Sequence, residues 1–273
     1  MPKITQQALP LYFLKGVIVA CSIALLYLPL HSQARELQIG VGNFEPFFEE
    51  KDERGLFMEL TREIFSLLPQ YNISFVFMSN HRLLFEIREG NKLDVACNIF
   101  ARSESNAFLS LPVYRYKDVA ISKRNDKLSI TSISDLGNYS IAAYQGAKKL
   151  LGHDFEAMAS SNRYYSEHAL PSDTTMRLVS GESEVRIGDY YIFLNDIEHR
   201  RHKQRGVKLS DYEIHPLWPM VFSHMAFKDE NLRDEVNEAI QILLDNGSID
   251  QIYRRFELEH GVDQPPNFPT GRH

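Results

Sequence analysis

The sequence is poor in several residue types that define special classes of protein. Its 273 residues include only two cysteines and one tryptophan, and two cysteines are too few to build a disulfide scaffold. The chain also has fewer basic than acidic residues: 30 Lys and Arg against 36 Asp and Glu give a formal net charge of -6. Nucleic-acid binders carry a basic patch or stripe, so an acidic chain is a poor candidate for that class.

What remains is an ordinary globular composition. Hydrophobic residues make up 44% of the chain and charged residues 24%, which excludes disorder, collagen and coiled coil as its main character. At about 150 residues per domain, this length predicts two domains.

The first 34 residues differ from the rest in containing no Asp or Glu. Lys3 and Lys15 precede an uncharged apolar run over Gly16–Leu30, and the small-x-small sequence His31–Ala34 follows. This order is typical of a signal peptide. We therefore expect residues 1–34 to be removed by cleavage after Ala34, and the remaining chain to be exported to the periplasm.

Two alternatives to cleavage stay open. A membrane-spanning helix needs about 20 apolar residues, which is longer than this run, and Pro29 also interrupts the run. Ile18–Cys21 resembles the lipobox of a lipoprotein, but that choice puts Lys15 inside a short apolar region. In the exported chain only Cys97 remains, and its apolar neighbours favour a buried core residue over a reactive thiol.

Strand-like and helix-like segments alternate along the first part of the exported chain. Apolar periodicity predicts strands over 37–41, 73–77 and 93–97 and helices over 58–68 and 82–88. This alternation is typical of parallel βαβ units and indicates an α/β fold.

The second part of the chain repeats the alternation. Predicted strands cover 118–122, 140–144, 185–187 and 221–227, and predicted helices cover 147–157, 172–178 with Ser172 as cap, 190–199, 232–244 and 249–256. Arg186 interrupts an apolar strand, which favours an edge position for it. Residues 261–273 hold three Pro and two Gly without periodicity, so we expect a disordered tail.

Ligands of open α/β sheets bind beyond the carboxyl ends of the strands, and five residues there are candidates. Phe44 offers an aromatic wall, although it can equally plug the loop. Asn80 offers a polar contact or a helix cap. Arg102 can hold a carboxylate in a bidentate pair or simply be solvated.

The other two candidates precede predicted helices. Gln145 lies where free N–H groups at a helix N-terminus suit an anion. Asp189 can accept from an ammonium group or cap a helix.

The sequence supports no metal, cofactor or catalytic site. The run 198–205 places His199 and His202 on one helix end among four cations, and two ligands do not make a zinc site. A solvated helix end is the simpler interpretation. No Ser-His-Asp pattern, P-loop or HExxH motif occurs.

At these residues the chain resembles the family-3 extracellular solute-binding proteins, the receptors of polar-amino-acid ABC importers. The resemblance covers about residues 36–257 and rests on seven loose motifs in the right order. These are Gly42–Phe48, Gly55–Leu60, Leu84–Val95, Leu109–Pro112, Ser132–Leu136, Leu178–Asp189 and Leu232–Tyr253.

The resemblance implies a two-lobe, periplasmic-binding-protein-like type II fold, with two mixed sheets flanked by helices and a ligand cleft between the lobes. Lobe 1 would comprise 35–113 and 221–260, and lobe 2 would comprise 114–220. By position, Arg102 resembles the family's carboxylate-binding Arg, Asp189 its ammonium-binding Asp and Phe44 its aromatic wall.

The sequence also departs from the family pattern. Ala147 stands where a hydroxyl residue usually follows the Gly, and the usual Thr before Arg102 is missing. Asn80 replaces an aromatic found in many members, which suggests a more polar ligand.

The family implies a monomer that binds an amino acid or a related zwitterion and performs no chemistry, with a membrane permease as partner. Two alternatives stay open. One is a ligand-sensing module for a membrane sensor. The other is a lyase resembling the cyclohexadienyl dehydratases, for which Glu45 is the candidate acid.

Overall fold

The computed structural model describes residues 34–101, 106–198 and 206–269. It has two mixed sheets flanked by helices, which confirms the predicted fold class. The first sheet contains β1 (Arg35–Val41), β2 (Tyr71–Phe77), β3 (Val95–Ile99), β4 (Phe108–Leu109), β5 (Tyr114–Tyr116) and β11 (Val221–Phe227). The second contains β6 (Asp118–Lys123), β7 (Ile141–Tyr144), β8 (Tyr165–His168), β9 (Val185–Asp189) and β10 (Tyr212–His215).

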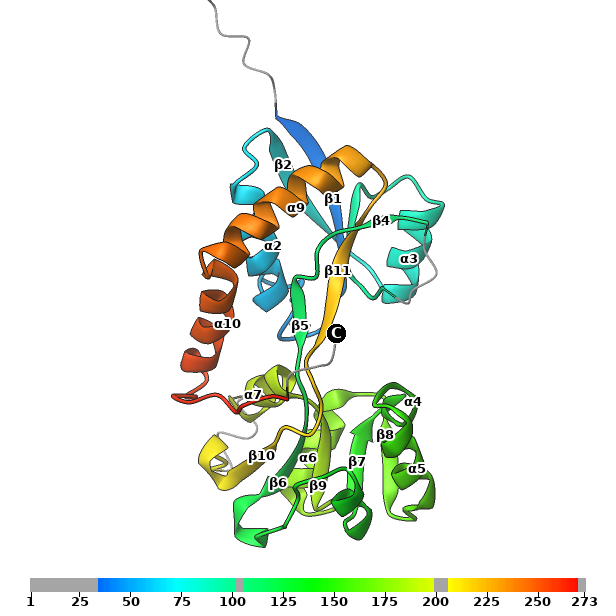
Figure 1. Cartoon of the computed structure of the whole chain (residues 1–273), viewed down its shortest axis with the longest axis vertical. Coiled ribbons are helices and arrows are strands. Elements are labelled where there is room, and N and C mark those ends of the chain that lie inside the picture. Colours follow the sequence, from blue (N-terminus) through cyan, green and yellow to red (C-terminus); the bar gives the residue numbers. More distant parts are fainter. Residues whose placement is uncertain (1–33, 102–105, 199–205, 270–273) are drawn as a thin grey trace, which may run out of the picture.

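Helices cover both faces of the first sheet (Figure 1). Its strand order is β2-β1-β3-β11-β4, with β5 pairing to β11. On one face α2 (Leu56–Ser66), α9 (Glu230–Asp245) and α10 (Ser248–Glu259) pack on Leu37 and Ile39. On the other face α3 (Asn80–Arg88) packs through Leu83, and Gly40 leaves the room that Leu83 needs.

The second sheet has the order β10-β6-β9-β7-β8. The helical elements of this part of the chain are α4 (Ala147–Leu150), α5 (His153–Ser161), α6 (Pro171–Ser180), α7 (Tyr190–Glu198) and the 3-10 turns η1 (Arg124–Asp126), η2 (Ser134–Asn138) and η3 (Leu209–Asp211). Phe155 of α5 and Trp218 pack edge to face on one side of this sheet, with ring centroids 5.5 Å apart. Leu178 of α6 and Phe193 of α7 are buried in a separate cluster.

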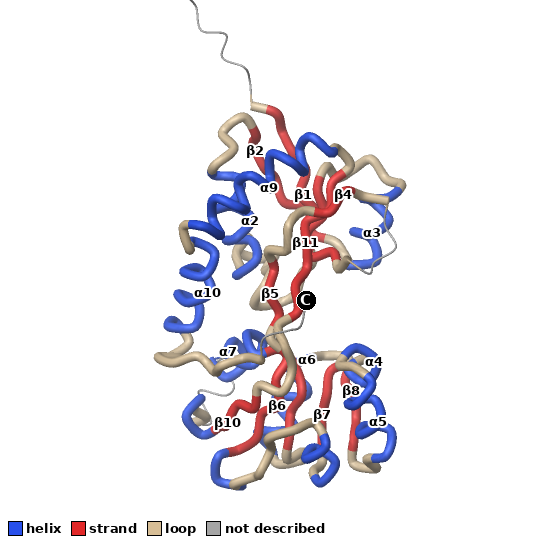
Figure 2. The backbone as a smooth tube through the Cα atoms, in the orientation of Figure 1, coloured by secondary structure: helices blue, strands red, loops and turns tan. Residues whose placement is uncertain are grey.

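The chain passes between the sheets at two places (Figure 2). Lys117 alone separates β5 from β6, and a short segment joins β10 to β11. Beside these crossings an aromatic cluster runs from one sheet to the other along α10 and α7. Tyr191 of α7 lies 5.5 Å from Tyr253 of α10 and 6.3 Å from Phe47. On the α10 side, packed aromatic rings therefore connect the two sheets.

The prediction that the strand containing Arg186 lies at an edge is wrong. β9 has β6 on one side and β7 on the other. Arg186 is fully buried there because the protein pairs its guanidinium: Nε donates to Thr175 Oγ1 at 3.1 Å and the side chain packs over Phe193. A buried cation is tolerated when its hydrogen bonds are met.

Three helix starts differ from the predictions. Gly152, at φ 92°, divides the predicted helix 147–157 into α4 and α5. Leu170 rather than Ser172 precedes α6, because Pro171 takes its first turn, where a missing N–H costs nothing. Ser79 rather than Asn80 caps α3, and its hydroxyl accepts from the Arg82 N–H at 3.3 Å.

The structure also differs from the predicted disordered tail over residues 261–269. Val262 is buried, and its carbonyl accepts from Arg254 of α10 at 2.7 Å. Phe268 packs against Tyr190 of α7, with ring centroids 6.1 Å apart. In Figure 1 this segment runs from α10 across to α7. The packing of Val262 and Phe268 therefore holds residues 261–269 in place, although their sequence has no apolar periodicity.

Within the described ranges, no helix has the length and apolar character needed to cross a membrane. The predicted signal peptide lies outside those ranges, apart from Ala34.

Candidate functional site

Two of the predicted residues meet at the end of β1. Phe44 and Asn80 lie on either side of Gly42: a Cβ there would lie 2.8 Å from the Phe44 ring and 3.3 Å from Asn80 Oδ1. Phe44 is part-buried and meets Phe47 and Phe48 edge to face at 5.6 and 5.7 Å. Since β1, β2 and β3 are parallel, their carboxyl ends lie at one edge, and the two side chains occupy that edge.

A second group joins this edge to the crossing strands. Tyr116 of β5 stacks on Phe100 with centroids 5.7 Å apart. The Tyr116 hydroxyl donates to Asn98 Oδ1 at 2.8 Å, and the Ser223 hydroxyl of β11 donates to the same oxygen at 2.7 Å. Asn98 adopts the left-handed conformation with φ 62°, which Asn tolerates better than most residues. The end of β3 is thereby fixed to both crossing strands.

Asp189 ends β9 in the second sheet and caps the next helix. Its Oδ1 accepts from the N–H groups of Tyr191 and Ile192 at 2.8 and 3.0 Å, and its Oδ2 accepts from the Lys117 N–H at 2.9 Å. The side chain is buried, and burial raises the pKa of Asp189 to about 6, although these backbone donors and Arg186 act in the opposite direction. Asp189 therefore caps α7, which is one of the two roles that the sequence predicted for it.

A second carboxylate, Asp118, lies beside Asp189. The two residues are cross-strand partners in the antiparallel pairing of β6 with β9. Asp118 Oδ2 accepts from the Tyr144 hydroxyl at 3.3 Å. Burial, reinforced by the charge of Asp189, raises the pKa of Asp118 to about 7.

The sequence did not single out Asp118, because it directed attention to the residues that follow strands. β6 runs antiparallel to β9, so its first residue lies at the edge where β9 ends. Asp118 could have been predicted from one feature of the sequence, which is an acidic residue at the start of an otherwise apolar strand.

Gln145 lies at the same edge of the second sheet. β7 and β9 are parallel with Ala143 opposite Ile187, so Gln145 and Asp189 each stand two residues beyond that pair. Gln145 is exposed, and its backbone N–H donates to the His168 carbonyl at 2.9 Å.

The N–H groups at the start of α4, which the sequence offered to an anion, already have an acceptor. The Gly146 N–H donates to Glu167 Oε2 at 2.8 Å and the Lys148 N–H to Glu167 Oε1 at 2.9 Å. The Tyr165 hydroxyl donates to Oε1 as well, at 2.8 Å. Desolvation opposes ionisation here, but the three hydrogen bonds outweigh it and lower the pKa of Glu167.

Two other candidates have separate outcomes. Arg102 lies outside the described residues, as does most of the basic run 198–205. Cys97 is a buried core residue as predicted, and burial raises its pKa to about 11.

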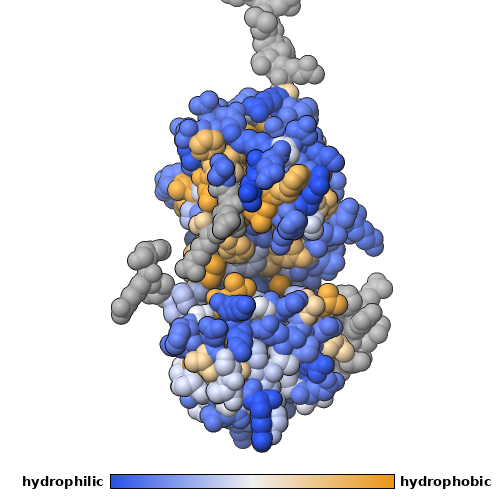
Figure 3. All heavy atoms as spheres, turned by 90° about the vertical axis from the view of Figure 1, so that its right-hand side faces the viewer, coloured by the Kyte–Doolittle hydropathy of each residue, from blue (hydrophilic) through white to orange (hydrophobic). Residues whose placement is uncertain are grey.

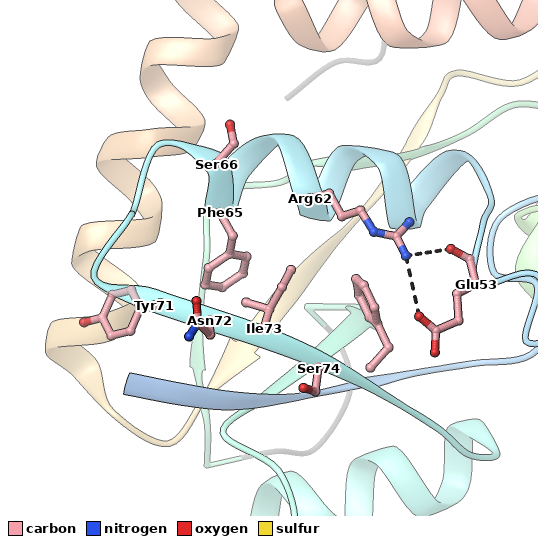
Figure 4. A pocket seen from close by; sticks show the side chains of 9 residues that line it. Glu53, Arg62, Phe65, Ser66, Tyr71, Asn72, Ile73 and Ser74 are labelled. Carbon is pink, nitrogen blue, oxygen red and sulfur yellow. Dashed lines mark hydrogen bonds and ion pairs between the residues drawn. The ribbon is translucent and has the colours of Figure 1, made fainter. Parts of the chain in front are cut away.

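Two open grooves lie away from these residues. In the groove of Figure 4, between α2 and β2, Arg62 donates to the Glu53 carbonyl at 2.6 Å and lies over the Phe75 ring at 4.9 Å. The other groove runs beside α10 and includes Glu45, the candidate acid of the lyase alternative. Neither is lined by the predicted site residues.

The narrow region between the two lobes exposes apolar residues beside the carboxylates of Asp118 and Asp189. Figure 3 shows hydrophobic residues gathered there on the face away from α10. Phe100, with 39% of its surface exposed, contributes from the first lobe. The site as a whole combines aromatic rings from one sheet with carboxylates from the other.

No protein-family model and no curated protein matches this sequence. Solved structures do match its fold. The GluR0 ligand-binding core in complex with L-glutamate is 15% identical, with a TM-score of 0.63, over 82% of this chain and 98% of that one. The amino-acid ABC transporter substrate-binding protein AbpA from Streptococcus pneumoniae, bound to L-arginine, is 20% identical, with a TM-score of 0.57, over 84% and 97%.

A histidine kinase sensor domain described as similar to periplasmic binding proteins also matches. It is 17% identical with a TM-score of 0.59, over 82% of this chain and 96% of that one. At these identities the comparisons establish the fold. The chain has the two-lobe, periplasmic-binding-protein-like α/β fold.

Proposed function

We propose that the protein is an exported solute-binding receptor that clamps a small polar ligand between its two lobes. The observation that carries this proposal is that one crossing strand connects the two sheet edges. Tyr116 of β5 hydrogen-bonds to Asn98 at the end of β3, on the sheet that carries Phe44 and Asn80, and Asp118, two residues on, pairs with Asp189 at the end of β9. Neighbours of the same fold bind arginine, glutamine or glutamate, which supports a ligand of amino-acid size.

In this proposal the lobes are the units predicted from the sequence. Lobe 1 comprises 35–113 and 221–260, and lobe 2 comprises 114–220. Among the described residues, two strand crossings join the sheets, so a hinge motion there would bring the two edges together, and a ligand that contacts both would favour the closed state. Signal-peptide cleavage after Ala34 would release this receptor into the periplasm.

The partner is proposed to be the membrane permease of an ABC importer, and the receptor a monomer. A membrane sensor is the second candidate, and the match to a histidine kinase sensor domain favours keeping it. Binding without chemistry is the simpler activity. Among the described residues, the one acid named for a lyase, Glu45, lies in the groove beside α10.

A thermal-shift screen of residues 35–273 against amino acids, amines and small anions tests the proposal. A cleft ligand that carries an ammonium or guanidinium group should lose its shift in Asp118→Asn and weaken in Asp189→Asn, and one held by its carboxylate should lose its shift in Arg102→Ala. Asp173→Asn, an exposed acid on α6, serves as the matched control. A ligand whose shift is the same in all variants would refute the site, and the absence of any ligand would refute the receptor function.

A further inference from the structure

We infer that the cleft selects a small organic cation and does not bind the α-carboxylate of its ligand on the lobe 2 side, because Glu167 holds the donors for such a group. This inference rests on the proposed receptor function and narrows its ligand class. It makes Glu167 and Asp118 specificity-determining residues.

The first step is the occupancy of the α4 donors. A ligand carboxylate needs unpaired N–H groups, and those of Gly146 and Lys148 are taken by the two oxygens of Glu167, at 2.8 and 2.9 Å. The third donor, the Tyr165 hydroxyl at 2.8 Å, fixes the orientation of this carboxylate. Ala147, between the two donors, is fully buried and carries no hydroxyl to add.

The second step is the charge of the edge. Asp118 and Asp189 lie on the neighbouring strands β6 and β9, and Glu167 lies on β8, which β7 separates from β9, toward the same end of the sheet. Among the described residues the cation nearest to this edge is the buried Arg186, which donates to the backbone carbonyl of Asp189 at 3.4 Å and forms no salt bridge with either carboxylate, so the three acids outnumber it. An anionic group brought here would meet like charges, whereas an ammonium or guanidinium would be attracted.

The third step is an accessible acceptor. Asp189 uses both oxygens on backbone N–H groups. Asp118 receives one hydrogen bond among the described residues, from Tyr144, and is only part-buried. Asp118 therefore has the free acceptor positions that an organic cation would take. Phe44 and Phe100, at the end of the first sheet, are part-buried and exposed respectively, and such rings would also favour a cation when the lobes close.

The experiment compares amino acids with their decarboxylated forms. Residues 35–273 are titrated calorimetrically with four pairs: arginine and agmatine, lysine and cadaverine, ornithine and putrescine, histidine and histamine. We expect at least one amine to bind as tightly as its amino acid or more tightly. If every pair that binds prefers the amino acid tenfold or more, the inference is overturned while the receptor function stands.

The role of Glu167 is tested separately. Glu167→Ala exposes the two donors, so the preference should move at least tenfold toward the amino acid of the pair. Glu156→Ala removes the same charge from the exposed face of α5 in the same lobe and should leave the preference unchanged. An unchanged preference in Glu167→Ala, with circular dichroism showing a folded protein, overturns the assignment of Glu167. If neither these pairs nor any other polar amino acid binds, the receptor function itself fails.

Discussion

Asp118 makes the unliganded protein sensitive to pH in a direction that can be calculated. Its pKa is about 7 in the fold against an ordinary 3.8. A group whose pKa is raised on folding contributes full stability below its unfolded value, and that contribution is lost as the pH rises through its folded value. Between pH 5 and pH 7 Asp118 alone lets the folded protein hold up to one proton more than the unfolded chain, so its contribution to the free energy of unfolding falls by at most about 1.4 kcal/mol per pH unit.

The substitution Asp118→Asn removes this titration. Asn keeps an oxygen for the Tyr144 hydroxyl and carries no charge, so its fold should resemble that of the wild type. A full three-unit shift corresponds to about 4 kcal/mol as an upper limit. Asp118 is part-buried, so we expect about 1–2 kcal/mol more stability for Asp118→Asn at pH 8 and little difference at pH 4.5.

Urea denaturation of residues 35–273, followed by circular dichroism at pH 4.5, 6, 7 and 8, measures this. The urea unfolding curves of wild type and Asp118→Asn should nearly coincide at pH 4.5 and should separate as the pH rises. Asp173→Asn, on the exposed surface of α6, should follow the wild type throughout. Equal pH slopes for wild type and Asp118→Asn would show that Asp118 is ordinarily solvated, and the account of a desolvated carboxylate at this edge would fail.

Three further predictions concern neighbouring parts of the fold. Lys117→Met removes the nearer of the two cations that pair with the buried carboxylate of Glu257, since the Lys117 Nζ lies 2.8 Å away and the Arg254 Nη1 3.6 Å. It should cost about 3 kcal/mol in urea denaturation, the low end for a broken buried pair, because Arg254 remains; a cost near zero would contradict burial of this pair. Gly42→Ala places a methyl 2.8 Å from the Phe44 ring and should weaken ligand binding, with a loss of stability of only about 1 kcal/mol; unchanged affinity would remove Phe44 from the site. Cys97 should react with a thiol reagent only after unfolding, because it is buried and its pKa is about 11; fast labelling of the native protein would contradict this.

The architecture was predictable where apolar periodicity is strong. Leu37, Ile39 and Val41 alternate along β1 and are all fully buried, and their spacing alone indicated a strand. The βαβ order of the first lobe followed from the same signal. The sequence makes Asp189 and Gln145 candidates because both stand at the carboxyl ends of predicted strands, and the structure places them at one edge of the second sheet.

The rest depended on contacts between distant segments. Asp118 was missed because strand direction within a sheet is not written in local periodicity, and β6 runs antiparallel to β9. Arg186 suggested an edge strand because its partners, Thr175 and Phe193, lie on helices whose positions relative to the strand the sequence does not give. Glu167 lies on β8, a strand without apolar alternation, so neither the strand nor its hydrogen bonds to α4 could be anticipated.

The central claim is that a ligand binds between the lobes and draws them together. It is tested most directly by the distance between spin labels at Glu89→Cys beside α3 and Glu156→Cys on α5, both exposed positions. Cys97 is buried and should remain unlabelled. Adding the tightest ligand of the screen should shorten and narrow the distance distribution, and Asp118→Asn should require more ligand for the same change. A saturating ligand that leaves the distance unchanged would contradict the account.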